Sequence, residues 1–365
     1  MGTTVPDGVD VVATPAEAQA MPVPPVLVVD TVTRWLDERG LGSGSLSWER
    51  IGDGQSNLTF LLTRGEGSDA RRLVLRRGPR PPLPPSTHDM LREARFQQVL
   101  GPRGVPVPGI LDVEEDTSLL GVPFYVMDLV DGLVVTTEEP PSLQDRPEER
   151  ARASRAVVDA LVRLHSVDVT DPAVAALGRP EGYLRRQIRR FSELWPQVST
   201  RDLPDFEPLT RWLAEHCPEE SAHAVVHGDF RLGNVMLDPA DLGRVAAVLD
   251  WEMATLGDPL ADLGYLTATW SDPDWEPTVM DHSTVTARDG WLRREELVEH
   301  YGAATGADLS TLPFYQVLAL WKSAVFCEAI RTRFLKGERP GDTFGPLLEE
   351  GVPGLLRAAR QYTAA

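Results

Sequence analysis

The order of strand-like and helix-like segments is the strongest constraint on the fold of this 365-residue chain. Three strands in succession are expected at 46–77, where apolar residues alternate and glycines mark the turns. Two further strands, at 110–113 and 124–130, follow an amphipathic helix expected at 87–100. Helical patterns dominate from residue 142 onward. Strands followed by helices predict an α+β chain with two lobes rather than alternating βαβ units.

Charge and hydropathy exclude several classes of protein. The chain has 36 Lys and Arg residues against 55 Asp and Glu, a formal charge of −19, whereas nucleic-acid binders usually carry a basic patch. No apolar run approaches the ~18 residues of a membrane span, and no basic residue precedes Arg34, as a secretory signal would require. We therefore expect a cytoplasmic protein that binds neither nucleic acid nor membranes, with its oligomeric state left open.

Lysine is nearly absent from the chain. The basic residues are almost all Arg, and the two lysines, Lys322 and Lys336, lie near the C-terminus. A mechanism that needs a lysine in the first half is excluded. Neither GxGxxG nor GxSxG occurs, which disfavours a dehydrogenase or a hydrolase.

The strongest local signal is the segment VVHGDFRLGNVMLDP at 225–239. Asp229 and Asn234 have the HxDxxxxN spacing of a catalytic loop for phosphoryl transfer, in which the Asp accepts the proton of the acceptor hydroxyl and the Asn binds Mg²⁺. Arg231 can offset charge on the transferring phosphate. The alternative is a surface hairpin that holds these side chains by chance.

A second acidic signal follows 21 positions after Asp229. The segment VAAVLDWE, at 245–252, is an apolar run that ends at Asp250, as expected where a strand delivers a carboxylate to a metal ion. An acid at a strand end means little alone. Together with Asp229 and Asn234 it favours phosphoryl transfer over coincidence.

These segments resemble the aminoglycoside phosphotransferase and choline kinase group of small-molecule kinases, over about residues 46–335. HGDFRLGN is similar to the catalytic loop of that group, LDWE to its metal-binding motif and LGDPLADLGYL to its continuation. The resemblance implies a protein-kinase-like two-lobed fold, with a small antiparallel-sheet N-lobe carrying one helix and a larger, mainly helical C-lobe. It also implies Mg²⁺ and ATP (or GTP) as cofactors, and a small hydroxylated molecule as the acceptor of the γ-phosphate.

Four segments are expected along this chain. Residues 1–25 are rich in Pro, Ala, Val and Thr without a helical or strand period, and are expected to form a flexible leader. The nucleotide-binding N-lobe is expected at 26–127, a hinge at 128–135, and the C-lobe with the catalytic loop, metal site and acceptor site at 136–365.

The turn between the first two strands of the N-lobe is a candidate phosphate-binding segment. Gly52 and Gly54 allow close approach of the backbone to phosphates, and Ser56 and Asn57 can donate hydrogen bonds to them. A plain hairpin turn explains this segment equally well without the later motifs.

Arg76 stands where a lysine is expected. In the strand RLVLRRG, alternation and the resemblance both place Arg76 at the position that grips the α- and β-phosphates, with Glu93 on the following helix as its partner. Arg keeps the charge but is longer and planar. The alternative for Glu93 is an exposed helix residue. The competing function is a non-catalytic nucleotide-binding pseudokinase or scaffold, with Arg76 marking lost activity.

The segment PFYVMDLVDG resembles the hinge, whose backbone near Met127 and Leu129 would meet the adenine. Within this group, the sequence looks most like the branch of kinase domains fused to acyl-CoA dehydrogenases. The likeness rests on Arg76, on the segment VLRRGP and on the catalytic-loop and metal-binding segments given above. It implies a hydroxyacyl-CoA acceptor. An aminoglycoside or an amino alcohol remains the alternative.

Charge does not decide between these acceptors. Residues 128–365 carry a net charge of −15, against −4 for 1–127, which favours a cationic acceptor through long-range steering. The arginines of YLRRQIRRF at 183–191 favour an anionic one, unless they only form a solvated face. Lys322 is either a surface residue or a residue of the acceptor pocket.

Overall fold

The computed structural model describes residues 3–5, 9–52, 57–80, 89–220, 222–339 and 341–364. The chain forms two compact units. The N-terminal unit comprises Met1–Gly101 and Pro108–Val130, and the C-terminal unit Pro102–Val107 and Asp131–Ala365. The division after Val130 falls within the segment expected to be a hinge.

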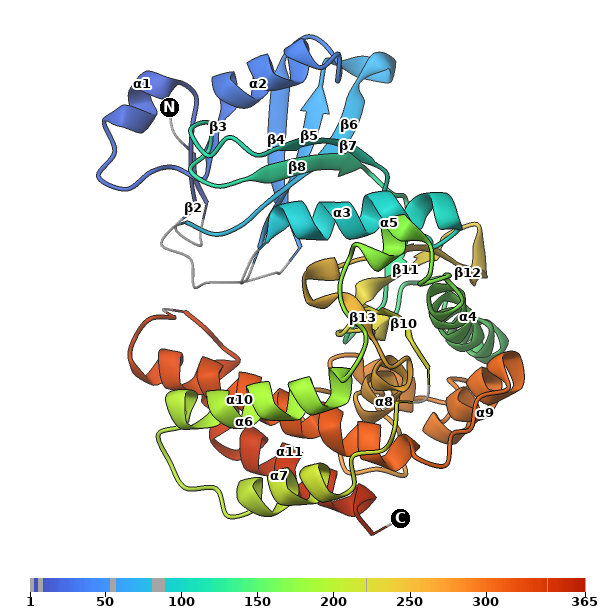
Figure 1. The fold of residues 1–365 in the computed structure, drawn as a ribbon. Coiled ribbons are helices and arrows are strands. Elements are labelled where there is room, and N and C mark those ends of the chain that lie inside the picture. The colour runs from blue at the N-terminus through green and yellow to red at the C-terminus, as the bar shows by residue number, and fades with distance from the viewer. Residues whose placement is uncertain are drawn as a thin grey trace. The chain divides into compact units, whose positions relative to one another are not determined.

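The N-terminal unit is built mainly of strands (Figure 1). Its strands and helices are β1 (Thr3–Val5), β2 (Val9–Val12), α1 (Pro15–Gln19), β3 (Leu27–Val28), α2 (Val29–Glu38), β4 (Leu46–Ile51), β5 (Leu58–Arg64), β6 (Arg71–Arg77), α3 (Met90–Leu100), β7 (Ile110–Glu114) and β8 (Phe124–Asp128). The last five strands form one antiparallel sheet in the order β4-β5-β6-β8-β7. The expected antiparallel sheet is therefore present.

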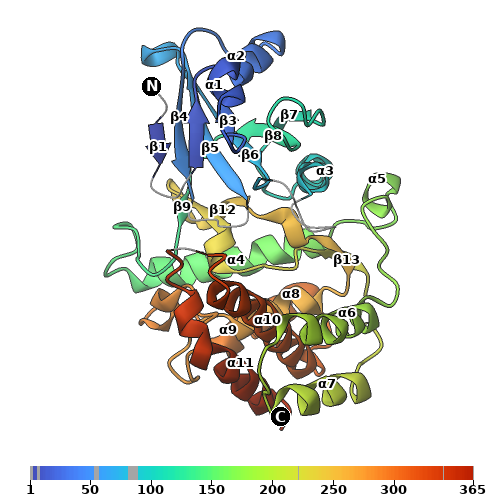
Figure 2. The ribbon, with the colours of Figure 1, turned by 90° about the vertical axis from the view of Figure 1, so that its left-hand side faces the viewer.

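Side-chain alternation gives this sheet two apolar faces. On one face, Leu73 and Leu75 of β6 cluster with Trp35 of α2. On the other face, Val74 of the same strand clusters with Met90 of α3. The expected helix, α3, and a second helix, α2, thus cover opposite faces because successive residues of a strand point in opposite directions (Figure 2).

The prediction of a flexible leader at 1–25 does not hold for residues 9–19. The strand β2 and the helix α1 lie there, and Val11 and Val12 are buried in the core of the N-terminal unit. β2 pairs in parallel with β3, with Val11 opposite Leu27 and Val12 opposite Val28. The sequence pattern of residues 1–25 did not indicate this strand because its pairing partner, β3, lies outside the Pro-rich segment.

The C-terminal unit is mainly helical, as expected for the C-lobe. Its strands and helices are β9 (Leu133–Val134), α4 (Pro147–His165), α5 (Pro172–Ala175), α6 (Tyr183–Val198), α7 (Phe206–Glu215), β10 (Ala224–Val226), β11 (Val235–Asp238), β12 (Asp241–Val248), β13 (Thr255–Gly257), α8 (Leu260–Ala268), α9 (Arg294–Thr305), α10 (Leu312–Leu335) and α11 (Leu348–Tyr362). Two small antiparallel sheets, β12-β11-β9 and β10-β13, carry the loops of interest.

Helix α10 lies at the centre of the helical part, in contact with α6, α7, α8 and α11 (Figure 1). It is apolar around most of its circumference because it has neighbours on several sides. No helix in the described part of the chain is long and apolar enough to cross a membrane.

Candidate active site

The loop between β10 and β11 brings three predicted residues together. Asn234, at the end of a single 3₁₀ turn (Leu232–Asn234), donates through Nδ2 to the Asp229 carboxylate (2.8 Å to Oδ2) and to the Asp229 carbonyl (2.9 Å). Arg231 Nε lies 3.5 Å from the same Oδ2. The Asp229 side chain is 23% exposed. Its carboxylate is therefore held in one orientation and remains accessible to a reactant.

Two buried side chains support the backbone of this loop. Asp262, on α8, accepts the N–H of His227 (2.6 Å) and of Gly228 (2.8 Å). The His227 ring accepts the N–H of Asp229 at Nδ1 (3.3 Å) and donates from Nε2 to the carbonyl of Leu249 (2.9 Å). Both ring nitrogens are therefore engaged with the backbone, so His227 has a structural role in the loop rather than a role in proton transfer.

Asp262 is in turn held by a chain of buried groups. His165 Nε2, on α4, lies 3.3 Å from the Asp262 carboxylate, and His165 Nδ1 lies 2.9 Å from the hydroxyl of Tyr301 on α9. The sequence predicts that Asp262 stabilises the segment after the metal loop by accepting backbone N–H groups or by capping a helix. The N–H groups that it accepts belong instead to the loop of Asp229.

Gly228 is required at its position by the backbone. Its φ is +84°, and a Cβ there would lie 2.7 Å from the carbonyl oxygen of Met253. Any larger residue would therefore strain the loop and also push it away from the segment that follows Asp250.

Tyr265 is a further member of the site that was missed in the sequence. Burial raises its pKa well above the usual value, and the charge of Asp229 and a hydrogen bond to its carboxylate raise it further. The phenol therefore remains protonated and donates to Asp229. Tyr265 lies three positions after Asp262 on α8, so one helix supplies both the anchor of the loop and a partner of its acid.

The two predicted metal ligands lie at the same end of a strand pair. β11 begins directly after Asn234, β12 ends two residues before Asp250, and Val235 lies opposite Val248. The N–H of Leu249 donates to the carbonyl of Asn234 (2.8 Å). Antiparallel pairing thus brings residues 16 positions apart in the sequence to one edge.

The donor atoms at this edge fit Mg²⁺. The Asn234 amide nitrogen donates to Asp229. The amide oxygen of Asn234 is therefore the atom that can bind a metal ion. Asp250 has φ +66°, a conformation unusual for a residue other than glycine and frequent at functional sites. Mg²⁺ prefers a few oxygen ligands from the protein and completes its shell with phosphates and waters. Among the described residues, no group of three or more His, Cys, Asp or Glu side chains is arranged to hold a metal.

Within the N-terminal unit, Arg76 and Glu93 form an ion pair. Arg76 Nε lies 2.9 Å from Glu93 Oε1, and the Glu93 side chain is only 1% exposed. Arg76 also donates to the hydroxyl of Thr59 (3.3 Å). The alternative of an exposed Glu93 is therefore wrong. Burial raises the pKa of Tyr125 well above its usual value, and the nearby charge of Glu93 raises it further.

The structure describes only some of the other candidate nucleotide-binding residues. Gly52 has φ +76° and Asn57 is buried, whereas Gly54 and Ser56 lie outside the described residues. Met127 lies in β8 between β6 and β7, and Leu129 follows the end of that strand. The N-terminal unit therefore presents Arg76, Glu93 and one positive-φ glycine as its best-defined elements.

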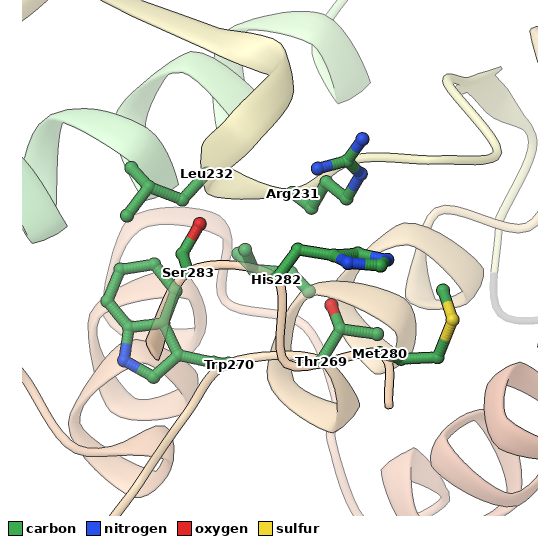
Figure 3. A pocket seen from close by; sticks show the side chains of 8 residues that line it. Arg231, Leu232, Thr269, Trp270, Met280, His282 and Ser283 are labelled. Carbon is green, nitrogen blue, oxygen red and sulfur yellow. The ribbon is translucent and has the colours of Figure 1, made fainter. Parts of the chain in front are cut away.

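Two pockets adjoin the predicted catalytic loop in the C-terminal unit. The first contains the Arg231 and His282 side chains (Figure 3), and is lined by Arg231, Leu232, Leu266, Thr269, Trp270, Met280, His282 and Ser283. The second is lined by Tyr183, Gly228, Ala261, Asp262, Tyr265, Tyr315, Leu318, Ala319 and Lys322. Burial and the charge of Arg231 lower the pKa of His282, which favours its neutral form. The sequence did not reveal these pockets because their residues come from several segments.

The chain is similar to known phosphotransferases and to parts of larger proteins. A model of the phosphotransferase enzyme family matches residues 47–309. Acyl-CoA dehydrogenase family member 11 of Gallus gallus is 33% identical over 323 residues, which cover 85% of this chain and 40% of that protein. The chain thus spans less than half the length of the acyl-CoA dehydrogenase relatives that it matches.

Solved structures have the same fold. A Ralstonia eutropha protein, provisionally assigned as an aminoglycoside phosphotransferase, has a TM-score of 0.76 and 27% identity, and the match covers 92% of this chain and 98% of that one. The aminoglycoside phosphotransferase APH(4)-Ia, in a ternary complex with ADP and hygromycin B, has a TM-score of 0.56 and 18% identity over 90% of this chain and 98% of the other. The predicted resemblance and the α+β, protein-kinase-like fold are confirmed. The chain belongs to the phosphotransferase enzyme family, whose fold supports small-molecule kinase activity.

Proposed function

We propose that this chain is a Mg²⁺-dependent kinase that transfers the γ-phosphate of ATP or GTP to a hydroxyl group of a small molecule. The observation that carries the proposal is the setting of Asp229, a partly exposed carboxylate oriented by Asn234 and Tyr265 with Arg231 beside it. A general base in that setting can take up the proton of an alcohol during phosphoryl transfer.

The proposed reaction forms one bond to the γ-phosphorus and breaks one. The acceptor oxygen bonds to the γ-phosphorus, the bond from that phosphorus to its bridging oxygen breaks, and the nucleoside diphosphate leaves. Asp229 takes up the hydroxyl proton, and Arg231 offsets charge on the transferred group. Asn234 and Asp250 would hold Mg²⁺, which supplies neutralisation of phosphate charge.

The N-terminal unit supplies the proposed nucleotide contacts. Arg76 binds phosphate oxygens and Glu93 holds its side chain in place. The turn residues cover the phosphates, and backbone groups near the end of β8 meet the base. These residues are Gly52, Gly54, Ser56, Asn57, Met127 and Leu129.

The acceptor is proposed from two directions. The curated relatives named acyl-CoA dehydrogenases favour a hydroxyacyl-CoA. The ternary complex of APH(4)-Ia with hygromycin B favours an aminoglycoside, and a solved choline/ethanolamine kinase family protein favours an amino alcohol.

A non-catalytic nucleotide-binding protein or scaffold is the competing proposal. Its one supporting observation is Arg76 at the position expected for a lysine. The ion pair of Arg76 with buried Glu93 weighs against it, because the arginine makes the contact expected of the lysine.

The test is a turnover screen with Mg-ATP and, separately, Mg-GTP. Aminoglycosides, choline-like amino alcohols and hydroxyacyl-CoAs are added in turn, and nucleoside diphosphate release is followed by a coupled assay. ³¹P NMR then identifies the phosphorylated product. Acceptor-dependent release supports the kinase. Tight nucleotide binding without release for every acceptor class supports the scaffold.

A further inference from the structure

We propose that Lys322 binds an anionic group of the acceptor and makes the enzyme select anionic hydroxy compounds over cationic ones. The inference rests on the proposed kinase function and names the acceptor class of the same site. Its starting point is the placement of a lone lysine in the second pocket.

Lys322 lies close to the catalytic loop. It lines one pocket together with Gly228, the neighbour of Asp229, and with Tyr265, which donates to Asp229. In this proposal, a small acceptor whose hydroxyl meets Asp229 extends toward the Lys322 amino group. Lys322 is also the single charged residue in the apolar stretch LALWKSAVF of α10, where Trp321 and Val325 are fully buried.

The Lys322 ammonium group has no ion-pair partner among the described residues. No carboxylate in that part of the chain lies within 4.0 Å of it, and its nearest described aromatic contact is the ring of Phe191, 5.1 Å from Nζ. Asp262 lines the same pocket, but its oxygens accept the N–H groups of His227 and Gly228. A half-buried cation in this position is best compensated by an anion from outside the chain.

The electrostatic surroundings agree with this assignment. Burial lowers the pKa of Lys322 to about 8, Arg190 lowers it as well, and Asp262 and Asp229 act in the opposite direction. The two carboxylates therefore do not compensate the buried charge. Functional sites commonly contain such perturbed groups.

The arginines of α6 extend the positive charge beyond the pocket. Arg186 donates to the carbonyls of Glu181 and Arg179, so it serves the local backbone. Arg189 and Arg190 are exposed and form no ion pair within the described residues. Arg190 thus adds positive charge near Lys322, although residues 128–365 carry a net charge of −15.

Two sources supply an anion of this kind, a carboxylate and a phosphate ester. The shared chemistry is a negatively charged oxygen group on a molecule that also carries a hydroxyl. We compare 3-hydroxybutyrate, glycerol 1-phosphate and 3-hydroxybutyryl-CoA with the neutral 1,3-butanediol and with the polycation kanamycin.

The first experiment measures binding without turnover. The full chain is treated with an amine-reactive reagent at pH 8, and mass spectrometry quantifies modification of Lys322 and of the exposed Lys336 as an internal control. We expect the anionic probes to protect Lys322, and 1,3-butanediol and kanamycin not to do so. Equal protection by all probes, protection by kanamycin alone, or none at all overturns the inference. Because no nucleotide is needed, this result is independent of whether the chain is a kinase.

The second experiment measures specificity during turnover. Lys322→Met removes the charge, Lys322→Arg keeps it, and Lys336→Met is the matched control. We expect Lys322→Met to raise the KM of the preferred anionic acceptor about 10- to 100-fold, with nucleotide KM unchanged, and Lys322→Arg to restore much of the loss. A similar loss for a neutral acceptor, or none for the anionic one, contradicts the role of Lys322 while leaving the kinase proposal intact. Thermal melting identifies a variant that fails to fold.

Discussion

Arg76 and Asp229 are held in place in different ways. In the N-terminal unit, Arg76 forms an ion pair with the buried carboxylate of Glu93 and donates to the hydroxyl of Thr59. In the C-terminal unit, Asp229 sits on a loop whose backbone is fixed by Asp262 and His227. The first arrangement tolerates another cation of suitable reach. The second depends on backbone geometry and admits few substitutions.

This difference explains where the chain departs from the pattern that the resemblance implies. An ion pair needs only charge and reach, so an arginine can take the place of a lysine. The catalytic loop places N–H groups, a glycine with positive φ and a buried acid in one arrangement, and here the sequence keeps the expected HGD and Asn. The predictions below test the two regions separately, from the largest expected effect to the smallest.

Asp229→Asn should abolish most of the turnover. The amide cannot accept the hydroxyl proton, and loss of a general base typically costs about 10²- to 10⁴-fold in kcat. Steady-state kinetics with the best acceptor measures the loss, and calorimetric titration should show nearly unchanged nucleotide binding. Turnover close to that of the parent protein would remove Asp229 from the proposed role.

Asp262→Ala should both destabilise the chain and lower kcat. It leaves the buried N–H groups of His227 and Gly228 without their acceptor, which costs about 2–4 kcal/mol in the free energy of unfolding. Asp262→Asn keeps one oxygen and should lose less. Denaturant unfolding measures both, and the exposed Asp274→Ala is the control. Equal stability of Asp262→Ala and the control would show that the loop is held by other contacts.

Asp250→Ala should weaken binding of the Mg-nucleotide complex itself. Removing one oxygen ligand of the proposed metal site is expected to cost about 10- to 100-fold in affinity, on the scale seen for perturbed metal sites. Calorimetric titration with and without Mg²⁺ separates the metal contribution. If the variant loses equal affinity in the presence and absence of Mg²⁺, Asp250 is not a ligand.

Arg76→Ala should raise the Kd of the Mg-nucleotide about tenfold or more, because a charge-assisted hydrogen bond to phosphate is lost. Arg76→Lys keeps the charge and should bind better than Arg76→Ala, which would show that this region needs charge more than shape. Titration calorimetry measures both. Unchanged binding by Arg76→Ala would place the phosphates elsewhere.

The acceptor KM should rise above pH 8 and stay level below it. Burial lowers the pKa of Lys322 to about 8, so the charge that binds an anion is present below this pH and is lost above it. At pH 9 the KM is expected to be about tenfold higher than at pH 7. The tyrosines that line the pocket, Tyr183, Tyr265 and Tyr315, have raised pKa values and stay neutral.

The remaining groups facing Lys322 bear on the interpretation of that profile. Asp229 and Asp262 are the nearby carboxylates and Arg190 is the nearby cation. Arginine keeps its charge throughout this range, so Lys322→Arg should give a flat profile. A profile that rises equally in both proteins assigns the titration to another group.

Much of the fold followed from local patterns. Alternation at 46–77 and 124–130 predicted strands of the five-stranded sheet, and the helical patterns from residue 142 onward predicted a mainly helical C-terminal part. The segment at 9–19 did not follow, because burial of Val11 and Val12 depends on a strand outside it. Local patterns report the element that they build, whereas pairing depends on a distant partner.

The candidate site divides in the same way. Motif spacing predicted Asp229, Arg231, Asn234 and Asp250, because a loop between two short strands needs fixed residues at fixed distances. Tyr265 was not identified, and Asp262 was predicted to stabilise the backbone of a different segment, because both residues reach the loop only through the packing of α8.

The sequence by itself determined the class of chemistry and the use of arginine in place of an N-terminal lysine, since both are written in residue identity and spacing. Only the tertiary structure decided the surroundings of Lys322. Its position in an apolar helix was equally compatible with a surface residue and a pocket residue. Packing of α10 against α6 and α8 brought it beside the catalytic loop without an ion-pair partner among the described residues, because the neighbours of a helix face are set by other helices.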